Sequence, residues 1–168
     1  MSAENLGRRF QMRQHLVSIG DDYSIENDRG ERVCEVDGKA LRIRDTFVLK
    51  DSEGRERYTC QEKKLRVRDT MHISRGSATV AKIQKALVNP LRERFTIDIE
   101  GGEDMIATGD IIDHEYTLKR GGEVVAEVSK KWFRVRDTYG IDVLTGDDPF
   151  LVMAIAVCLD AISHPAKD

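Results

Sequence analysis

The sequence predicts a mainly β protein: a closed antiparallel barrel of about twelve strands around a central hydrophobic C-terminal helix. Three observations predict this class. Short segments alternate between apolar and charged residues, polar segments with glycine separate them, and one long apolar segment lies near the C-terminus. The chain of 168 residues is long enough for one domain with its own core. We therefore expect a single domain over residues 1–168, with a core over about 9–163 and short flexible termini.

The expected strands follow from alternation with period two, which is typical of a half-buried strand. Leu41-Arg42-Ile43-Arg44 shows this pattern clearly. Because a large sheet has exposed edges, we expect it to close on itself. Further strands are predicted over Gln11–Val17, Arg57–Gln61, His72–Ser74, Thr79–Gln84, Arg94–Ile99, Met105–Ala107 and Glu123–Val128.

Polar segments that contain glycine predict the turns between these strands. Asn27–Gly30, Asp51–Gly54 and Arg120–Gly122 are the clearest examples. Glycine and asparagine accept the positive φ that tight hairpin turns need. We therefore expect antiparallel hairpins at these three positions.

The segment Pro149–Leu159 breaks the alternation, because it is apolar throughout. We expect a helix with Asp148 as its N-cap and Pro149 as its first residue. A helix that is apolar on all sides is either buried or inserted in a membrane. About 14 residues give roughly 21 Å, which is shorter than the ~30 Å hydrocarbon core of a bilayer. Asp160 near its end also argues against insertion, so we predict a buried helix threaded through the barrel.

A motif of the form Lys-x-[Leu/Phe]-Arg-[Ile/Val]-Arg-Asp-Thr occurs three times, and each copy is followed by an aromatic residue or Met. The copies cover Lys39–Phe47, Lys63–Met71 and Lys131–Tyr139. Such repetition indicates that two halves of the chain share one plan, although the uneven spacing excludes a regular solenoid or propeller. The match also extends upstream of the first and third copies: Tyr23-Ser24-Ile25 corresponds to Tyr116-Thr117-Leu118, Gly30-Glu31 to Gly122-Glu123, and Glu35-Val36 to Glu127-Val128.

The basic residues of these copies are the candidate binding residues. On each predicted strand the apolar pair, Leu41/Ile43, Leu65/Val67 or Phe133/Val135, faces the core, so the arginines face outward. Arginine binds phosphate through two parallel hydrogen bonds, and neighbouring lysines add charge. The alternative is that the arginines pair with Asp45, Asp69 and Asp137 on a solvated face, where each pair contributes roughly 0–1 kcal/mol. The candidate anion-binding or lipid-binding residues are Arg42, Arg44, Lys63, Lys64, Arg66, Arg68, Lys130, Lys131, Arg134 and Arg136.

The sequence contains no pattern that predicts catalysis, a metal site or a cofactor. The four histidines form neither HExxH nor a His-x-x-x-His pair, and on a strand the adjacent His114 and Glu115 would point to opposite faces. No serine lies in a GxSxG motif, and no glycine-rich segment continues into the Gly-Lys-Ser/Thr of a phosphate loop. We therefore expect a protein that is not an enzyme.

Charge and cysteine content bear on partners and compartment. A protein that coats nucleic acid carries a large positive excess, so the net charge of -3 disfavours nucleic acid as a partner. The three cysteines, Cys34, Cys60 and Cys158, form no CxxC pair, and free thiols indicate a reducing compartment. Met1–Phe10 has no apolar run of the kind found in secretory signals. We expect a cytoplasmic protein, peripheral at the inner membrane surface if it binds lipid.

The segment Phe10–Ile25 resembles the opening of the LURP-one-related family. Val36–Phe47 and the start of the helix at Asp147-Asp148-Pro149 also lie where that family has them, so the resemblance covers about Arg9–Ser163. The family is similar in fold to the Tubby C-terminal domain and to phospholipid scramblases. The resemblance therefore implies a twelve-stranded barrel around a central C-terminal helix.

The family has no established enzymatic activity, whereas its Tubby-like relatives bind phosphoinositide head groups through surface Lys and Arg. The cysteine-rich segment of the scramblases is missing here, and the acidic loop Asp142–Asp148 is sparse, so neither scrambling nor calcium dependence is expected. Our first hypothesis is a non-catalytic binding or scaffold domain that binds anionic phospholipid head groups through the basic strands. The second is a protein–protein interaction or structural module without a lipid ligand. The third is an enzyme or small-molecule binder with a pocket at one end of the barrel.

Overall fold

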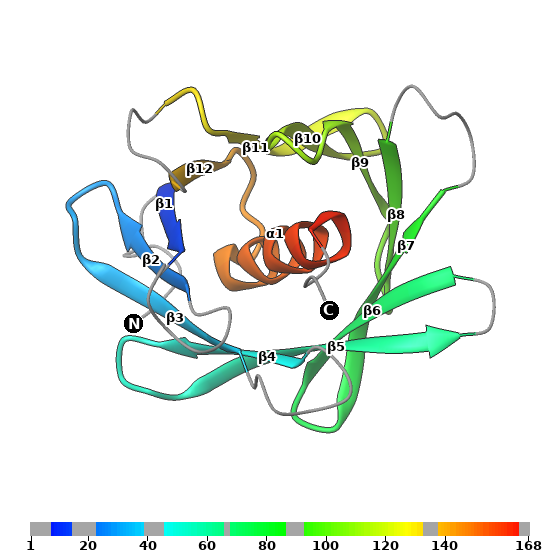
Figure 1. Ribbon diagram of the computed structural model, residues 1–168, viewed down its shortest axis with the longest axis horizontal. Coiled ribbons are helices and arrows are strands. Elements are labelled where there is room, and N and C mark those ends of the chain that lie inside the picture. Colours follow the sequence, from blue (N-terminus) through cyan, green and yellow to red (C-terminus); the bar gives the residue numbers. More distant parts are fainter. Residues whose placement is uncertain are drawn as a thin grey trace.

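The computed structural model describes residues 8–14, 23–38, 46–65, 68–86, 93–132 and 138–164. These residues form a ring of strands around one helix, as predicted (Figure 1). The elements in chain order are β1 (Arg9–Gln14), β2 (Tyr23–Asn27), β3 (Arg32–Gly38), β4 (Thr46–Asp51), β5 (Glu56–Leu65), β6 (Arg68–Arg75), β7 (Ala78–Lys85), β8 (Glu93–Ile99), β9 (Met105–Asp110), β10 (Glu115–Arg120), β11 (Glu123–Ser129), β12 (Thr138–Val143) and α1 (Pro149–Ser163).

Each strand pairs antiparallel with the strands before and after it in the sequence, and β12 pairs with β1 to close the barrel. At this closure Phe10 lies opposite Ile141 and Met12 lies opposite Tyr139. All four side chains are buried. Closure gives the twelve strands of the described chain two neighbours each, which removes the unpaired edges on which other chains could add strands.

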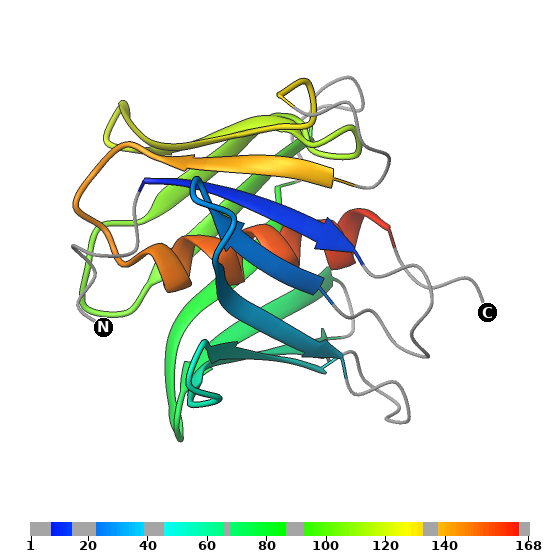
Figure 2. The same ribbon diagram turned by 90° about the vertical axis from the view of Figure 1, so that its left-hand side faces the viewer.

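The helix α1 runs through the barrel along its axis (Figures 1 and 2). Its N-terminus has the predicted cap, because Asp148 accepts a hydrogen bond from the backbone N–H of Phe150 at 3.0 Å and Pro149 is the first helical residue. The segment from Val152 to Leu159 is buried along its whole length against the inward faces of the strands. In the part of the chain that the structure describes, no helix is long and apolar enough to cross a membrane.

Most of the predicted strands and turns are confirmed. The expected strands from Arg57 to Val128 all lie within observed ones, and β1 covers the described part of Gln11–Val17. At the predicted hairpins, Gly30, Gly54, Gly121 and Gly122 all have positive φ. The predicted strand Leu41–Arg44 lies outside the described residues.

The expectation that one strand of the second motif copy carries both Leu65 and Val67 is wrong. β5 ends at Leu65 and β6 begins at Arg68, and these two residues lie opposite each other. The chain therefore reverses within the copy, and Lys63–Met71 is divided between two antiparallel strands. The alternation was misleading because a two-residue reversal can occur here without the glycine that normally marks one.

The two hairpins that match each other in sequence also have the same strand register. Tyr23 lies opposite Val36 in the β2–β3 pair, and Tyr116 lies opposite Val128 in the β10–β11 pair. Counted from these two tyrosines, the register shifts after the third residue pair in both hairpins, at Ile25/Glu26 and at Leu118/Lys119. The sequence match thus extends to residue pairing and to the position of the bulge.

A charge placed inside the helix–barrel contact tests this packing. Replacing Ile155, which is fully buried, by Asp should abolish cooperative folding, because a buried charge without a partner costs several kcal/mol of a total stability of about 5–15 kcal/mol. Leu151→Asp is the matched control on the same helix, since Leu151 is partly exposed and can turn a carboxylate toward water. Urea unfolding followed by circular dichroism measures both. Equal losses in the two variants would contradict a helix buried at Ile155.

Candidate functional site

The alternating strand directions bring the flanks of all three motif copies to one end of the barrel. Each copy spans the connection from an odd-numbered to an even-numbered strand, β3 to β4, β5 to β6 and β11 to β12. In an antiparallel ring the strand ends on either side of these connections all lie at the same end. The helix also ends there, because it begins where β12 ends and runs back through the barrel (Figure 2, where this end lies on the right). We call it the exit end, defined by the ends of β3, β5, β11 and α1.

The structure describes the predicted binding residues unequally. Arg42, Arg44, Arg66, Arg134 and Arg136 lie outside the described residues. The strands β5 and β6 include the backbone of Lys64 and Arg68, whose side chains are not described. The remaining three predicted residues, Lys63, Lys130 and Lys131, are all exposed.

Lys63 contributes to a positive potential on the outer wall of the barrel. On β6, His72 lies between Gln61 of β5 and Lys82 of β7, and Lys63 is two residues further along β5. Burial lowers the pKa of His72 below its usual value, and the charges of Lys63 and Lys82 lower it further. Burial and the two lysine charges therefore both disfavour a positive charge on the imidazole.

Lys130 and Lys131 are paired with acidic residues, as in the ion-pair alternative. Lys130 Nζ lies 2.6 Å from a carboxylate oxygen of Asp113, and Lys131 Nζ lies 3.9 Å from Glu115. Glu115 also accepts hydrogen bonds from the Ser129 hydroxyl and from both lysine backbone N–H groups. The backbone N–H groups of the two lysines thus help to hold the end of β11, and the neighbouring carboxylates partly offset the lysine charges.

A polar cluster at the exit end was not predicted from the sequence. It consists of Tyr23, His114, Tyr139, Asp160 and His164, and we call it the Asp160 cluster. Asp160 Oδ1 lies 2.6 Å from His114 Nε2 and 3.0 Å from His164 Nδ1, and the Tyr23 hydroxyl donates to Oδ2. The His114 ring stacks on Tyr139 with 4.2 Å between the ring centroids.

These contacts keep the Asp160 carboxyl ionised although only 8% of the residue is exposed. Burial alone raises the pKa of Asp160, but the hydrogen bonds from His114 and Tyr23 and the nearby histidines outweigh it, so the pKa lies below its usual value. Burial, followed by the Asp160 charge, raises the pKa of Tyr116 and Tyr139 well above the usual range. The cluster therefore presents one carboxylate among neutral phenols.

The cluster was not predicted from the sequence because its members are separated by long stretches of chain. His114 is in the turn before β10 rather than on a strand, and its φ of +53° is unusual for a residue other than glycine. No short motif joins it to His164. The available signal was Asp160, the one charge in the apolar helix, with His164 four residues later on the same helix face.

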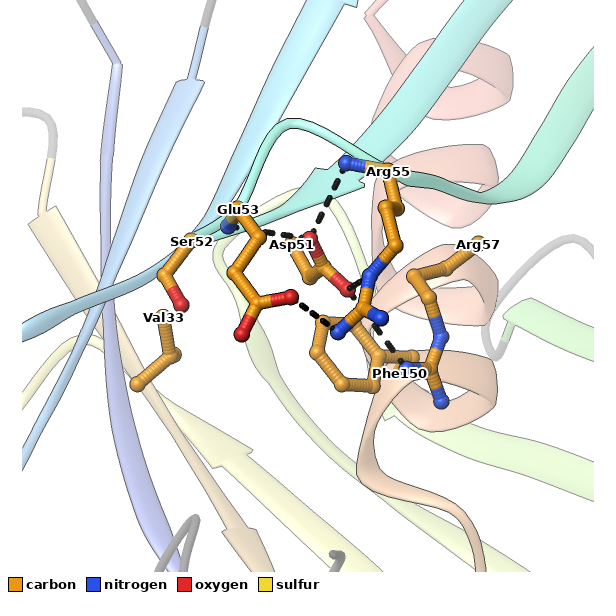
Figure 3. A pocket seen from close by; sticks show the side chains of 7 residues that line it. All are labelled: Val33, Asp51, Ser52, Glu53, Arg55, Arg57 and Phe150. Carbon is orange, nitrogen blue, oxygen red and sulfur yellow. Dashed lines mark hydrogen bonds and ion pairs between the residues drawn. The ribbon is translucent and has the colours of Figure 1, made fainter. Parts of the chain in front are cut away.

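The opposite end of the barrel holds a small pocket beside the start of α1 (Figure 3). Asp51 accepts hydrogen bonds from the backbone N–H groups of Glu53 and Arg55, both at 3.0 Å, and the Arg57 guanidinium lies 4.4 Å from the centre of the Phe150 ring. The enclosed free volume is about 10 Å³, room for about one water molecule. The pocket is therefore a hairpin fixed against the helix and does not fit a small-molecule ligand.

The outer wall carries a shallow depression over β9, β10 and β11 with a volume of about 430 Å³. Gly109, Glu115, Tyr116 and Trp132 are among the residues that line it. The Trp132 ring also contacts Arg9, whose guanidinium carbon lies 5.1 Å from the ring centre. The depression is broad and open, unlike the enclosed clefts in which small molecules usually bind.

Twelve antiparallel strands closed around a C-terminal helix define the Tubby-like class of barrel. The X-ray structure of the Arabidopsis thaliana protein AT5G01750 has this fold, with a TM-score of 0.70 over 97% of both chains and 13% identity. The chain belongs to the LURP-one-related family, whose model matches residues 8–160. It is also 27% identical over 157 residues to the uncharacterized protein YxjI of Bacillus subtilis (strain 168), which covers 94% of both chains. The predicted fold class and family are confirmed, and nothing in these comparisons indicates catalysis.

The Asp51 hairpin gives a pH-dependent contribution to stability. Burial tends to raise the pKa of Asp51, but the hydrogen bonds from Arg55 and Glu53 lower it below its usual value. A lowered folded-state pKa stabilises the fold above the unfolded value of about 3.9, and this contribution is lost as the pH falls through the folded value.

Asp51→Asn should therefore lower the free energy of unfolding by about 1 kcal/mol near pH 7, because the amide keeps the backbone hydrogen bonds but loses the ion pair with Arg55. Asn27 accepts two backbone N–H groups in the same way in the β2–β3 turn. Urea unfolding at about pH 7 and about pH 3 measures the difference, which should shrink in acid. A difference that stays constant between these pH values would exclude the carboxylate as its source.

Proposed function

We propose that this chain is a non-catalytic binding domain that docks on anionic phospholipid head groups through the exit end of its barrel. The observation that supports the proposal is topological, because the described strand ends that flank the three basic motif copies all lie at that end. Arginine suits this role since its guanidinium binds phosphate oxygens in pairs. The arginines concerned are Arg42, Arg44, Arg66, Arg68, Arg134 and Arg136.

The local charge matters here because the whole chain has a net charge of -3. Attraction to an anionic surface falls off within a Debye length of about 8 Å at physiological salt, so only charges near the contact contribute. Lys63 adds to the basic end along β5, whereas Lys130 and Lys131 contribute less because Asp113 and Glu115 neutralise them. We therefore assign the binding mainly to the arginines and Lys63.

An exposed apolar side chain at the same end favours a membrane surface over a soluble phosphate compound. Ile112, in the turn between β9 and β10, is 51% exposed. A large apolar residue beside basic groups is typical of peripheral proteins that insert a side chain between lipid head groups. The free and buried cysteines agree with a cytoplasmic location, where such a domain would meet the inner membrane surface.

Vesicle co-sedimentation of the full chain tests the proposal. Neutral phosphatidylcholine vesicles are compared with vesicles that contain phosphoinositides, at low and at physiological salt. We expect binding only to the anionic vesicles, and weaker binding at the higher salt because the contact is electrostatic. Absence of binding to every vesicle would contradict the proposal and favour a protein partner instead.

Charge reversal locates the contact. Arg66→Glu with Arg68→Glu, or Arg134→Glu with Arg136→Glu, should weaken vesicle binding by more than about 10-fold, since each basic residue at the surface contributes about 1 kcal/mol. The control reverses Arg29 and Arg32, two exposed arginines at the opposite end of the barrel. If the control pair weakens binding as much as the motif pairs, the contact is not at the exit end.

A second matched pair of variants tests whether an apolar side chain contributes to vesicle binding. Ile112→Ser should weaken binding to anionic vesicles by about 3- to 10-fold, because part of the ~2 kcal/mol for burying an isoleucine side chain is lost. Leu144→Ser is the control, since Leu144 is 37% exposed but follows β12 at the opposite end. Equal affinity of both variants and the unmodified protein would exclude insertion of Ile112.

A further inference from the structure

We propose that the Asp160 cluster binds a divalent transition-metal ion, with His114, Asp160 and His164 as its protein ligands. One nitrogen of each imidazole and one oxygen of the carboxylate lie within 4.8 Å of one another. The three residues come from two elements that are far apart in the sequence, the turn before β10 and the end of α1. This site goes beyond the proposed lipid contact and does not depend on it.

The donor set selects the class of metal. Two imidazole nitrogens and one carboxylate oxygen are ligands of Zn²⁺ and of similar ions such as Co²⁺ and Ni²⁺. Ca²⁺ and Mg²⁺ prefer sites made of oxygen alone. A site with three protein ligands leaves a fourth position open to water or to an anionic group.

The ligand atoms are close to the separations that a metal requires. Bonds of about 2.0–2.1 Å at tetrahedral angles place two ligand atoms ~3.3 Å apart. Asp160 Oδ1 now lies 2.6 Å from His114 Nε2 and 3.0 Å from His164 Nδ1. Each of these two pairs therefore has to separate by less than about 1 Å, and the two histidine nitrogens lie within 4.8 Å of each other. The His164 side chain, which is 44% exposed and lies just past the helix end, has room to move.

The surroundings of Asp160 and His114 hold these two ligands in place. The Tyr23 hydroxyl donates to Asp160 Oδ2, the carboxylate oxygen that would not bind the metal, which is the usual arrangement around a metal-binding carboxylate. The His114 ring is held between Tyr139 and His164, stacked on both at centroid distances of 4.2 Å and 5.4 Å.

The His114 backbone adds a second, independent observation. Its φ of +53° lies in the left-handed region, where residues other than glycine are strained. Its N–H donates to Ile111 O at 3.1 Å and closes the turn. Backbone strain of this kind is concentrated at functional sites, where it holds a side chain in a defined position.

The alternative role of the cluster is structural, with the histidines donating hydrogen bonds to a buried carboxylate at the end of α1. Both roles predict that the cluster contributes to stability. They differ in metal uptake, and the thiols do not obscure this measurement because Cys34, Cys60 and Cys158 are all buried.

Isothermal titration of the full chain with Zn²⁺, in buffer without lipid, tests the proposal. We expect one ion to bind per chain, while Mg²⁺ and Ca²⁺ give no signal at the same concentration. Co²⁺ should bind the same site and show the visible absorption of a four-coordinate nitrogen and oxygen complex. Failure of the folded protein to bind Zn²⁺ would overturn the proposal.

Variants assign the site. His164→Gln should weaken Zn²⁺ binding by more than about 10-fold, and Tyr23→Phe by about 10-fold through the lost support of Asp160. His72→Gln, which changes a histidine on β6 outside the cluster, should bind as tightly as the unmodified protein. Circular dichroism confirms that each variant is folded. Unchanged binding in His164→Gln, or equal loss in His72→Gln, would overturn the assignment.

Discussion

The filling of the barrel by α1 is the contact on which the rest of the structure depends. A closed ring of twelve strands has an interior too wide for its own side chains to fill, and an unfilled interior would forfeit the packing that stabilises a core. The apolar helix supplies the missing volume, with Val152 to Leu159 buried on every side. Its composition is thus explained by its position, because a helix surrounded by sheet has no side on which polar residues would meet water.

Because the helix fills the interior, a binding site has room only at the two ends of the barrel or on its outer wall. Within the described residues, the pocket beside the start of α1 has room for about one water molecule and is fixed by Asp51, Arg57 and Phe150. The start of the helix is further held by Asp148, which accepts a hydrogen bond from the Tyr58 hydroxyl at 2.6 Å. The exit end differs, because there the helix ends among ionisable side chains, and the strand ends that flank the arginine-rich motif copies lie there too.

The sequence predicted the features that depend on neighbouring residues. Alternation predicted the strands, glycine predicted the turns, and Asp148 with Pro149 predicted the start of the helix, since each involves contacts within a few residues. The second motif copy was misread because Leu65 and Arg68 face each other across a reversal that contains no glycine. The Asp160 cluster could not be predicted, because its contacts depend on the ring topology that brings the turn before β10 to the end of α1.

The relation between the two halves of the chain explains why the cluster forms where it does. The matching hairpins β2–β3 and β10–β11 place Tyr23 and Tyr116 at equivalent positions in their strand pairs. The helix α1 has no counterpart in the other half of the chain. The matching hairpins therefore surround a single Asp160. Tyr23 donates a hydrogen bond to this carboxylate. The charge of Asp160 acts on Tyr116 through space and contributes to its raised pKa. The two remaining donors to Asp160 come instead from His114 and His164, residues outside the matching segments. Because the helix is not repeated, only one of the two equivalent tyrosines, Tyr23, hydrogen-bonds to Asp160. The Asp160 cluster at the exit end is therefore asymmetric.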